Sequence, residues 1–366
     1  MPTYALIFGK NPDLAWGEFG HFTRRFGLRI ELIERPRMWV AFRASEDVER
    51  FFPRLGSSLK LVRLVGEGTE AVKNIEYAKL FTVSLYGPSS WVLWRKLGSE
   101  VKRIFKSVGP SKFFKPARVY SMPSELALKG FPKVKDIVFL FRKGKDPLVG
   151  ETIRIVDPFE LKKLDVGRPY HDGKIGIPLR LARTLLNLGE VIEGPVLDPF
   201  CGLGTIVMEA LLQGFSVFGC DIDSTRILRA RENIKWLMRN FDINGSFKLR
   251  VCDARELTRF LGKGKRFEAV ISEPYMGEPL RRKPSRPEAL RIARLLDKIY
   301  RGVLLEVFSV TDRGVFVFPA FNTTEGIYRP RRKWLRKIGL EVKERYLDYE
   351  RRHRIIRDIH VMEVVS

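Results

Sequence analysis

Acidic residues and glycines follow a short apolar run in the second half of this chain, and their spacing suits nucleotide binding. The run 194–197 ends at Asp198, and a turn with Gly202 and Gly204 leads into the segment 205–213, whose apolar positions recur at helical spacing. Glycines let the backbone approach a ligand closely, and the free N–H groups at a helix start favour electron-rich groups. A strand, a turn and a helix that hold a nucleotide-like ligand are therefore expected.

Three further apolar runs end in polar residues in the same way. The second ends at Asp221, about 20 residues after the first acid, where nucleotide-binding sheets place an acid for the ribose hydroxyls. The third ends at Asp253 and Ala254, and the fourth at the tetrapeptide Ser272-Glu273-Pro274-Tyr275. Ligands of an open parallel sheet lie at the carboxyl ends of its strands, so these residues are expected to line one crevice.

The elements that must position these residues predict an α/β fold with a parallel sheet. The strands are expected at 194–197, 216–220, 247–252, 267–271 and 315–318, with an antiparallel ending at 359–365. A dinucleotide is not the expected ligand, because Val207 stands where the dinucleotide fingerprint needs its third glycine.

Three motifs in this region resemble those of one family. They are Asp198-Pro-Phe-Cys-Gly-Leu-Gly204-Thr, Gly219-Cys-Asp-Ile-Asp223 and Asn233-Ile-Lys-Trp236. With them, residues 166–366 resemble the methyltransferase domain of the THUMP-associated RNA amino-methyltransferases, a group that includes the archaeal and eukaryotic tRNA guanine-N2 enzymes. The resemblance implies a Rossmann-like class I methyltransferase fold and S-adenosylmethionine as the cofactor.

The resemblance also implies roles for the residues of the expected crevice. Asp198 and the glycine loop would hold the methionine part of the cofactor, Asp221 the ribose, and Asp253 with Ala254 the adenine edge. The expected cofactor-binding residues are Asp198, Phe200, Gly202, Gly204, Thr205, Asp221, Ile222, Asp253 and Ala254. The expected catalytic residues are Ser272, Glu273, Pro274 and Tyr275. Arg168-Pro169 and Leu181-Ala182-Arg183 match family segments that cover the cofactor pocket.

The tetrapeptide 272–275 suits methylation of an exocyclic base amine, whose lone pair is delocalised into the ring. Polar groups that accept hydrogen bonds from the amine, and an aromatic ring that stacks on the base, align the nitrogen with the methyl donor. The resembled superfamily has Asp, Asn or Ser, then Pro-Pro and an aromatic residue, so Glu273 is a departure. Ser272 resembles the cytosine-N4 branch, which favours N4 of cytidine in structured rRNA; N2 of guanosine in tRNA is the alternative.

The first half of the chain is expected to form two α+β domains. Residues 1–78 predict the order β-α-β-β-α-β of a ferredoxin-like domain, with helices at 11–26 and 45–52. Residues 79–165 are similar to a THUMP domain, an RNA-binding module. Between Arg95 and Lys145 fourteen basic residues stand against three acids, which favours a phosphate-binding surface. Residues 157–166 are expected to be a linker to the methyltransferase domain at 166–366.

The composition indicates a polyanionic partner. The net charge of +24 points to nucleic acid, here rRNA or tRNA, and no apolar run approaches the length of a membrane span. We therefore expect a cytoplasmic protein, with a monomer favoured. Cys201, Cys220 and Cys252 are expected to pack against the sheet as free thiols, and no metal site is expected.

Two other functions were weighed against RNA methylation. Methylation of a side-chain amide in a protein uses similar chemistry, but the large basic surface argues against it. A non-catalytic RNA-binding or ribosome-assembly factor with a vestigial cofactor site is the other alternative. What argues against such decay is the joint presence of Asp198, Gly202, Gly204, Asp221, Asp253 and Tyr275.

Overall fold

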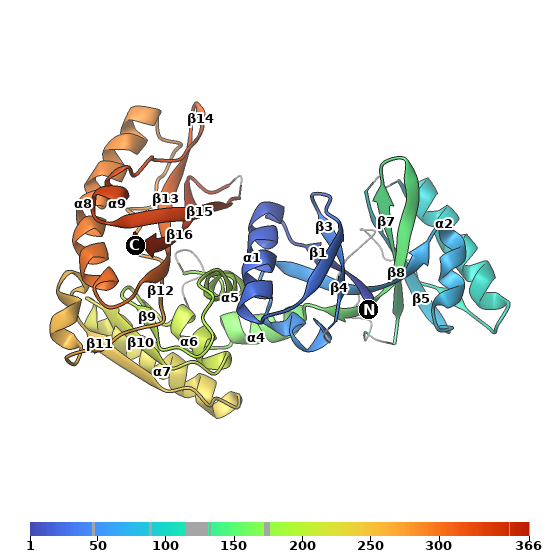
Figure 1. Cartoon of the computed structure of the whole chain (residues 1–366), viewed down its shortest axis with the longest axis horizontal. Helices are drawn as coiled ribbons and strands as arrows, with labels where there is room; N and C mark the ends of the chain where they lie inside the picture. Colours follow the sequence, from blue (N-terminus) through green and yellow to red (C-terminus); the bar gives the residue numbers. More distant parts are fainter. Residues whose placement is uncertain are drawn as a thin grey trace. The chain divides into compact units, whose positions relative to one another are not determined.

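The computed structural model divides the chain into two compact units (Figure 1). It describes residues 1–45, 48–87, 90–114, 131, 133–171, 176–350 and 352–365. Unit 1 consists of Met1–Pro12, Gly27–Pro53 and Ser57–Leu161, and unit 2 of Asp13–Phe26, Arg54–Gly56 and Lys162–Ser366. No helix of the described residues is long and apolar enough to cross a membrane.

Unit 1 is built on an eight-stranded sheet with the order β2-β3-β1-β4-β8-β7-β5-β6. Its strands are β1 (Thr3–Phe8), β2 (Ile30–Glu34), β3 (Trp39–Ala44), β4 (Ser58–Glu67), β5 (Leu80–Tyr86), β6 (Lys112–Phe113), β7 (Lys135–Arg142) and β8 (Lys145–Ile155). The pairs among β1 to β4 are antiparallel, and β5 runs parallel to β6 and β7. The strands of 1–78 and 79–165 therefore share one sheet; the division into two domains there stays a prediction.

Two helical expectations for the first half need correction. Residues 46 and 47 of the helix expected at 45–52 lie outside the described residues, and the described remainder contains the single-turn 3-10 helices η1 (Val48–Arg50) and η2 (Phe52–Arg54) in place of one α-helix. Proline at position 53 contributes, because it has no backbone N–H for an α-helical hydrogen bond. The expected linker is helical instead, as α4 (Pro158–Val166). It begins with a proline in the first turn, and the Asp157 carboxylate accepts a hydrogen bond from the Phe159 N–H at 2.8 Å.

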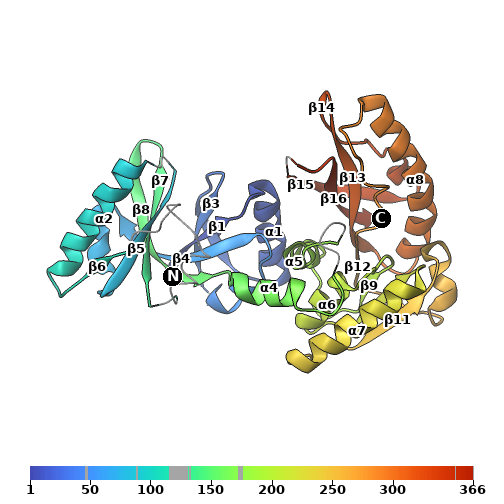
Figure 2. The ribbon, with the colours of Figure 1, turned by 180° about the vertical axis from the view of Figure 1, so that it is seen from behind.

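Helix α2 (Trp91–Lys106) lies on one face of the unit 1 sheet (Figure 2). Ser90 caps it, because its side chain accepts a hydrogen bond from the Leu93 N–H. Trp94, Leu97, Val101 and Phe105 pack against apolar residues of β5, β7 and β8. The opposite side of α2 carries exposed basic side chains. A short 3-10 helix, η3 (Thr69–Asn74), completes this core.

A fully buried ion pair crosses the middle of the unit 1 sheet. The Lys60 ammonium on β4 lies 2.7 Å from the Asp136 carboxylate on β7 and donates to the Ser84 hydroxyl on β5 at 2.9 Å. The hydroxyls of Ser84 and Thr152 donate to the same carboxylate, each at 2.6 Å. Burial alone would lower the pKa of Lys60, yet Asp136 raises it. Four adjacent strands therefore meet at one satisfied polar cluster.

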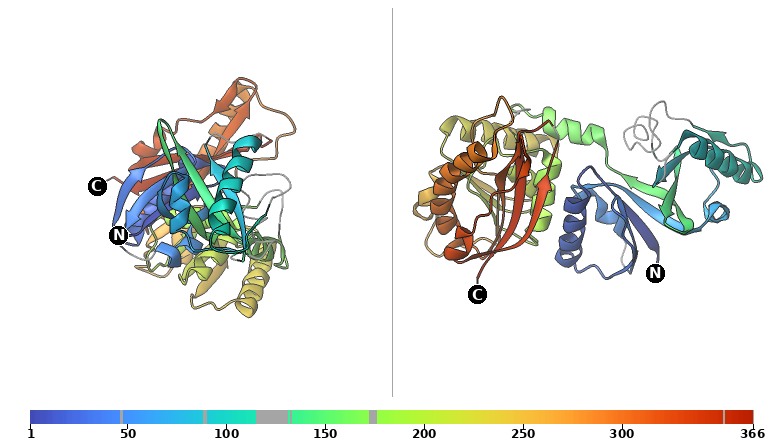
Figure 3. Two further views of the ribbon diagram at one scale, coloured as in Figure 1. Left: turned by 90° about the vertical axis from the view of Figure 1, so that its right-hand side faces the viewer. Right: turned by 90° about the horizontal axis from the view of Figure 1, so that it is seen from above.

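Unit 2 is built on a second sheet (Figure 3), in which the strand order is β11-β10-β9-β12-β13-β16-β15 and β14 pairs with β13. Its strands are β9 (Val196–Asp198), β10 (Val217–Asp221), β11 (Phe247–Val251), β12 (Ala269–Ser272), β13 (Arg313–Thr323), β14 (Gly326–Tyr328), β15 (Leu340–Asp348) and β16 (Ile355–Val364). The first five strands in that order are parallel, and β16 runs antiparallel between β13 and β15. The predicted parallel sheet with an antiparallel ending is confirmed.

Helices cover both faces of this sheet. The helices α5 (Leu179–Leu188), α6 (Thr205–Leu212) and α7 (Ser224–Asn240) pack on one face. The helix α8 (Arg286–Phe308), with η4 (Ala254–Phe260) and α9 (Trp334–Lys337), packs on the other. The two layers give the α/β fold that the sequence predicts.

Helix α1 (Pro12–Arg25) belongs to unit 2, although its sequence lies within residues 1–78. Its Glu18 carboxylate accepts a hydrogen bond from the Asn187 side-chain amide at 2.7 Å, and Arg25 donates to the same side chain. Asn187 lies on α5 and is fully buried. These polar contacts join α1 to the helical layer of unit 2.

The Lys60 cluster predicts an asymmetry in stability. Replacing Lys60 with Met leaves the Asp136 carboxylate buried without its cation, so we expect the free energy of unfolding to fall by about 3–5 kcal/mol. The double variant Lys60→Met, Asp136→Leu removes both charges and is expected to recover most of that loss. Urea unfolding followed by circular dichroism measures both. If the double variant is no more stable than Lys60→Met, the loss of stability does not come from the unpaired Asp136 carboxylate.

Candidate functional site

The predicted tip residues gather at the carboxyl edge of the unit 2 sheet. Asp198 ends β9, Asp221 ends β10 and Ser272 ends β12, while Asp253 follows β11. These four strands are neighbours and parallel, so their ends lie along one edge. The structure thus brings together the residues that the strand-end pattern selected.

Asp198 and Ser272 meet at the centre of this edge. The Ser272 hydroxyl donates a hydrogen bond to the Asp198 carboxylate at 2.7 Å, and the Phe200 N–H donates to it at 3.2 Å. Burial raises the pKa of Asp198 to about 7, and the neighbouring carboxylates of Asp221 and Glu273 add to the shift. The Ser272 hydrogen bond opposes it. This edge of the sheet is therefore electronegative, and the Asp198 carboxylate is stabilised by a nearby cation.

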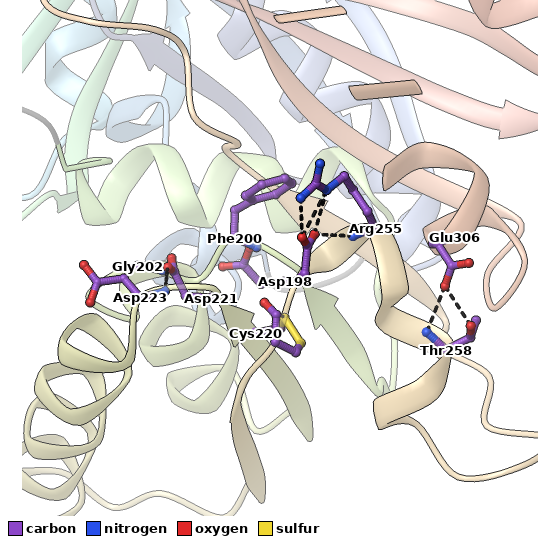
Figure 4. The surroundings of a disulfide bond; sticks show 11 residues. Asp198, Phe200, Gly202, Cys220, Asp221, Asp223, Arg255, Thr258 and Glu306 are labelled. Carbon is purple, nitrogen blue, oxygen red and sulfur yellow. Dashed lines mark hydrogen bonds and ion pairs between the residues drawn. A yellow bond between two sulfur atoms is a disulfide. The ribbon is translucent and has the colours of Figure 1, made fainter. Parts of the chain in front are cut away.

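The glycine loop has the backbone conformation that its sequence predicts. Gly202 and Gly204 have φ values of 51° and 84°, in the left-handed region that favours glycine. Gly204 precedes the first turn of α6, where Thr205 begins the helix. The Gly202 N–H donates to the Asp221 carboxylate at 2.9 Å (Figure 4). Asp221 therefore orders the glycine loop, which begins after Asp198.

The second and third strand tips differ in how they present their acids. Asp221 accepts hydrogen bonds only from backbone groups among the described residues, from Gly202 and from Asp223 at 3.0 Å. Ile222 beside it is 68% exposed, so an apolar surface adjoins the acid. Asp253 is ion-paired with Arg255 at 2.5 Å, which lowers the pKa of Asp253. Ala254 is buried.

Within the tetrapeptide, only the aromatic residue is exposed. Ser272 is fully buried, Pro274 is buried, and Tyr275 is 51% exposed. The Glu273 carboxylate lies 2.5 Å from the Arg357 guanidinium of β16. The Tyr275 hydroxyl donates to Glu278 at 2.6 Å. The loop is thus anchored on its inner side and presents one ring outward.

Comparison with known proteins identifies the class of domain that carries this sheet edge. Residues 170–309 match the family model described as UPF0020, RMKL-like, methyltransferase domain. Residues 170–309 are a methyltransferase domain. This match and the relative described next confirm the resemblance to the S-adenosylmethionine-dependent RNA amino-methyltransferases, and the cofactor is S-adenosylmethionine. The roles of the predicted site residues stay predictions.

One curated relative and two solved structures extend the match along the chain. The tRNA (guanine(10)-N2)-dimethyltransferase of Pyrococcus abyssi is 24% identical over 324 residues, which are 87% of this chain and 88% of the relative. The crystal structure of TrmN from Thermus thermophilus covers 99% of this chain and all of its own, with a TM-score of 0.57 and 17% identity. SMU.472, crystallised in complex with SAH, covers 100% of this chain and 99% of its own, with a TM-score of 0.51 and 15% identity. The two structures show the same fold.

Asn233 and Arg168, which the family segments already include, make contacts around the glycine loop that the sequence did not reveal. Asn233 is fully buried on α7, and its side chain bonds both the N–H and the carbonyl of Tyr170, at 2.9 and 2.8 Å, and the carbonyl of Leu203 at 2.9 Å. Arg168 donates to the Thr205 hydroxyl at 2.8 Å. The segment before the domain is thereby tied to the glycine loop. A polar Asn on the apolar stripe of its helix was the available signal.

The expectation for the cysteines is wrong in part. Cys220 and Cys252 form a disulfide between the ends of β10 and β11, beside the strand tips, with Cα atoms 5.7 Å apart (Figure 4). Their separation along the chain concealed this pairing, because only the parallel register of β10 and β11 brings the two strand ends together. Cys201 is buried and free, as expected. Among the described residues, no group of three His, Cys, Asp or Glu is placed to hold a metal ion.

The charges of the site suit the cofactor. S-adenosylmethionine carries a sulfonium and an ammonium, and the edge of the sheet offers the buried Asp198 with Asp221 close enough to raise its pKa. A cation placed there relieves the repulsion between the carboxylates. Asp198, Asp221 and the glycine loop are the residues that would hold it.

The raised pKa of Asp198 predicts a pH-dependent affinity. A cationic cofactor favours the ionised carboxylate, so binding releases the proton that Asp198 carries below about pH 7. We expect the Kd for S-adenosylmethionine to rise about tenfold between pH 8 and pH 6. Isothermal titration in buffers of different ionisation enthalpy measures the affinity and the released proton.

Asp198→Asn is the control for this titration. The amide cannot ionise, so the variant is expected to bind the cofactor weakly and with no change between pH 6 and pH 8. S-adenosylhomocysteine, which lacks the sulfonium charge, is expected to show a smaller pH effect on the wild type. The same tenfold change in the Asn variant would assign the proton to another group.

Proposed function

We propose that this enzyme transfers a methyl group from S-adenosylmethionine to N2 of guanosine in tRNA. The observation that carries the proposal is the Pyrococcus abyssi relative, because the alignment spans both halves of the chain rather than the cofactor domain alone. Guanosine N2 in tRNA was the alternative that the sequence left open beside N4 of cytidine in rRNA. The relative favours this alternative over the cytidine target.

The position of Ser272 also weakens the argument for cytidine. That interpretation depended on Ser272 alone, as the residue that would meet the target amine. The side chain is fully buried, and its hydroxyl proton is donated to Asp198. A hydroxyl held in this way has a structural partner within the protein. Its identity as serine therefore says little about which base enters the site.

The tetrapeptide supports amine methylation by positioning. The cofactor supplies an electrophilic methyl group on its sulfonium. The nitrogen lone pair forms the new N–C bond while the S–C electrons return to sulfur, and the nitrogen then loses a proton. Such a transfer needs alignment and a water-poor site more than covalent help. The half-exposed ring of Tyr275 offers a stacking surface for the base, and Tyr300 donates a hydrogen bond to the carbonyl of Tyr275 at 2.6 Å.

Both units offer basic surfaces for a polynucleotide. In unit 2 the loop that leads from the tetrapeptide to α8 carries exposed Arg281, Arg282 and Lys283. In unit 1 the outer side of α2 carries exposed Arg95, Lys96, Arg103 and Lys106. Each surface suits contact with phosphates, which supports an RNA substrate and a THUMP-like role for 79–165. Residues 115–130 of that basic segment lie outside the described residues.

Methyl transfer to defined RNA tests the proposed substrate. A tRNA transcript is incubated with the protein and labelled S-adenosylmethionine, and its nucleosides are analysed by mass spectrometry. We expect N2-methylated guanosine, and the loss of the signal when guanosine 10 is replaced by adenosine. N4-methylcytidine in rRNA, with none in tRNA, would restore the cytidine interpretation. Cofactor binding without transfer to any RNA would favour a non-catalytic RNA-binding protein.

The exposed ring of Tyr275 predicts a separation of binding from turnover. Tyr275→Ala removes the stacking surface, which is worth about 1–3 kcal/mol for one base, so kcat/KM for RNA is expected to fall by about 10–100-fold. The Kd for the cofactor is expected to stay within about twofold of the wild type. Tyr275→Phe keeps the ring and is the matched control. Loss of turnover in the Phe variant as well would point to the hydroxyl instead.

A further inference from the structure

Arg357 holds the residue at which this chain departs from the resembled tetrapeptide. Its Nε lies 2.5 Å from the Glu273 carboxylate, and another guanidinium nitrogen donates to the Gly176 carbonyl at 3.3 Å. The side chains of Arg357 and Glu273 are only 13% and 10% exposed. A charge-assisted hydrogen bond in such a place is stronger and more directional than one at the surface. The contact joins β16 to the end of β12, two strands away.

The surroundings of Glu273 leave Arg357 as its partner. Asp348 of β15 lies 3.7 Å from the same guanidinium, while Asp198 of β9 and Tyr300 of α8 face Glu273 from the other elements. All of these neighbours are acidic or neutral, so Arg357 supplies the positive charge at this point. Burial opposes the charged form of Arg357, yet Glu273 and Asp348 raise its pKa. A carboxylate engaged in this way is held as an ion-pair partner.

Three of the four residues of the tetrapeptide are held by contacts with other elements. Ser272 is fixed by its hydrogen bond to Asp198, and the carbonyl of Tyr275 is fixed by Tyr300. Pro274 restricts the residue before it to extended conformations, but it does not fix where that residue points. The ion pair supplies this constraint for Glu273. The inner side of the loop is therefore set by one anchor from each of three different elements.

We propose that Arg357 is a positioning residue for methyl transfer, which fixes the tetrapeptide loop through Glu273 so that Tyr275 meets the base in the productive orientation. The proposal rests on the proposed function, since it names a residue that acts on the same site. It assigns Glu273 a structural role in place of the catalytic one expected from the sequence. An ion pair here restrains the chain at the position that proline occupies in the resembled superfamily.

A double-mutant cycle tests the proposal with the full-length protein and a tRNA transcript. Arg357→Gln leaves the Glu273 carboxylate without its cation, so kcat is expected to fall by about 100-fold, the cost of a small misplacement in a site of this kind. The Kd for S-adenosylmethionine, from isothermal titration, is expected to stay within about twofold of the wild type. Arg357→Lys keeps the charge and is expected to recover part of the loss.

The cycle is completed by Glu273→Gln and by the double variant Arg357→Gln, Glu273→Gln. The double variant has no carboxylate at position 273 left without its cation, so its kcat is expected to exceed that of Arg357→Gln by about tenfold. Arg266→Gln is the matched control, because it removes an arginine from an ion pair with Asp312 before β12 and β13, at the opposite ends of these strands. It is expected to turn over like the wild type.

Two results would overturn the role of Arg357. One is a kcat of Arg357→Gln equal to that of the Arg266→Gln control. The other is a Glu273→Gln variant far slower than Arg357→Gln, with a double variant no faster than Glu273→Gln, which would make Glu273 act directly on the substrate. If Arg357→Gln does not fold, the Lys and double variants still carry the test. Absence of methylguanosine with the wild type would count against the proposed function instead.

Discussion

The hydrogen bond from Ser272 to Asp198 joins the two central strand tips of the methyltransferase sheet, and the other site residues are placed around it. Strand β9 is short, so its end is fixed by its neighbours and by this contact. The carboxylate also orders the chain at Phe200, where the glycine loop begins. Burying the Asp198 carboxylate near other carboxylates lowers the stability of the folded protein. The same arrangement favours the binding of a cation.

The raised pKa of Asp198 reflects the cost of burying this carboxylate near others. Its value in the folded protein, about 7, lies well above the ordinary 3.8, so the folded state holds a proton that the unfolded chain releases. The group therefore costs no stability below about pH 4, and the cost is complete above about pH 7. One pKa unit corresponds to about 1.4 kcal/mol, which makes the cost a few kcal/mol at most. A cationic ligand offsets it, so the site is stabilised by its own cofactor.

The residues at the carboxyl edge of the sheet could be predicted from the sequence, but the residues that hold the tetrapeptide in place could not. Asp198, Asp221 and Ser272 follow apolar runs, and the carboxyl ends of parallel strands must meet, so residues of this kind can be found without a structure. Arg357 and Tyr300 could not be found in this way. Tyr300 lies on the apolar stripe of the helix α8, and Arg357 lies on β16, an antiparallel strand late in the chain. Only the folded structure shows that both side chains contact the tetrapeptide.

The corrections in the rest of the fold have the same cause. Residues 45–52 carry a helix-like pattern, but Pro53 follows at once and has no backbone N–H for an α-helical hydrogen bond, and the described part of the segment forms short 3-10 turns. Lys60 occupies a strand position where a lysine usually faces solvent, and its burial depends on hydroxyls and a carboxylate from three other strands. Local sequence determines which segments become strands. The order and register of the strands in the sheet determine which polar groups meet.

The charges of the chain act at two ranges. A net charge of +24 attracts a polyanion from a distance, and salt screens that attraction beyond about 10 Å. Within the site the sign is reversed, because Asp198 and Asp221 lie at adjacent strand tips with few cations near them. A polyanion attracted to the whole protein is therefore repelled from this acidic edge of the sheet, which suits a cationic cofactor. In the proposed reaction the phosphates would contact the basic loop at 281–283 while the uncharged base approaches this edge. The exposed ring of Tyr275 precedes that loop in the chain and would be the surface on which the base stacks.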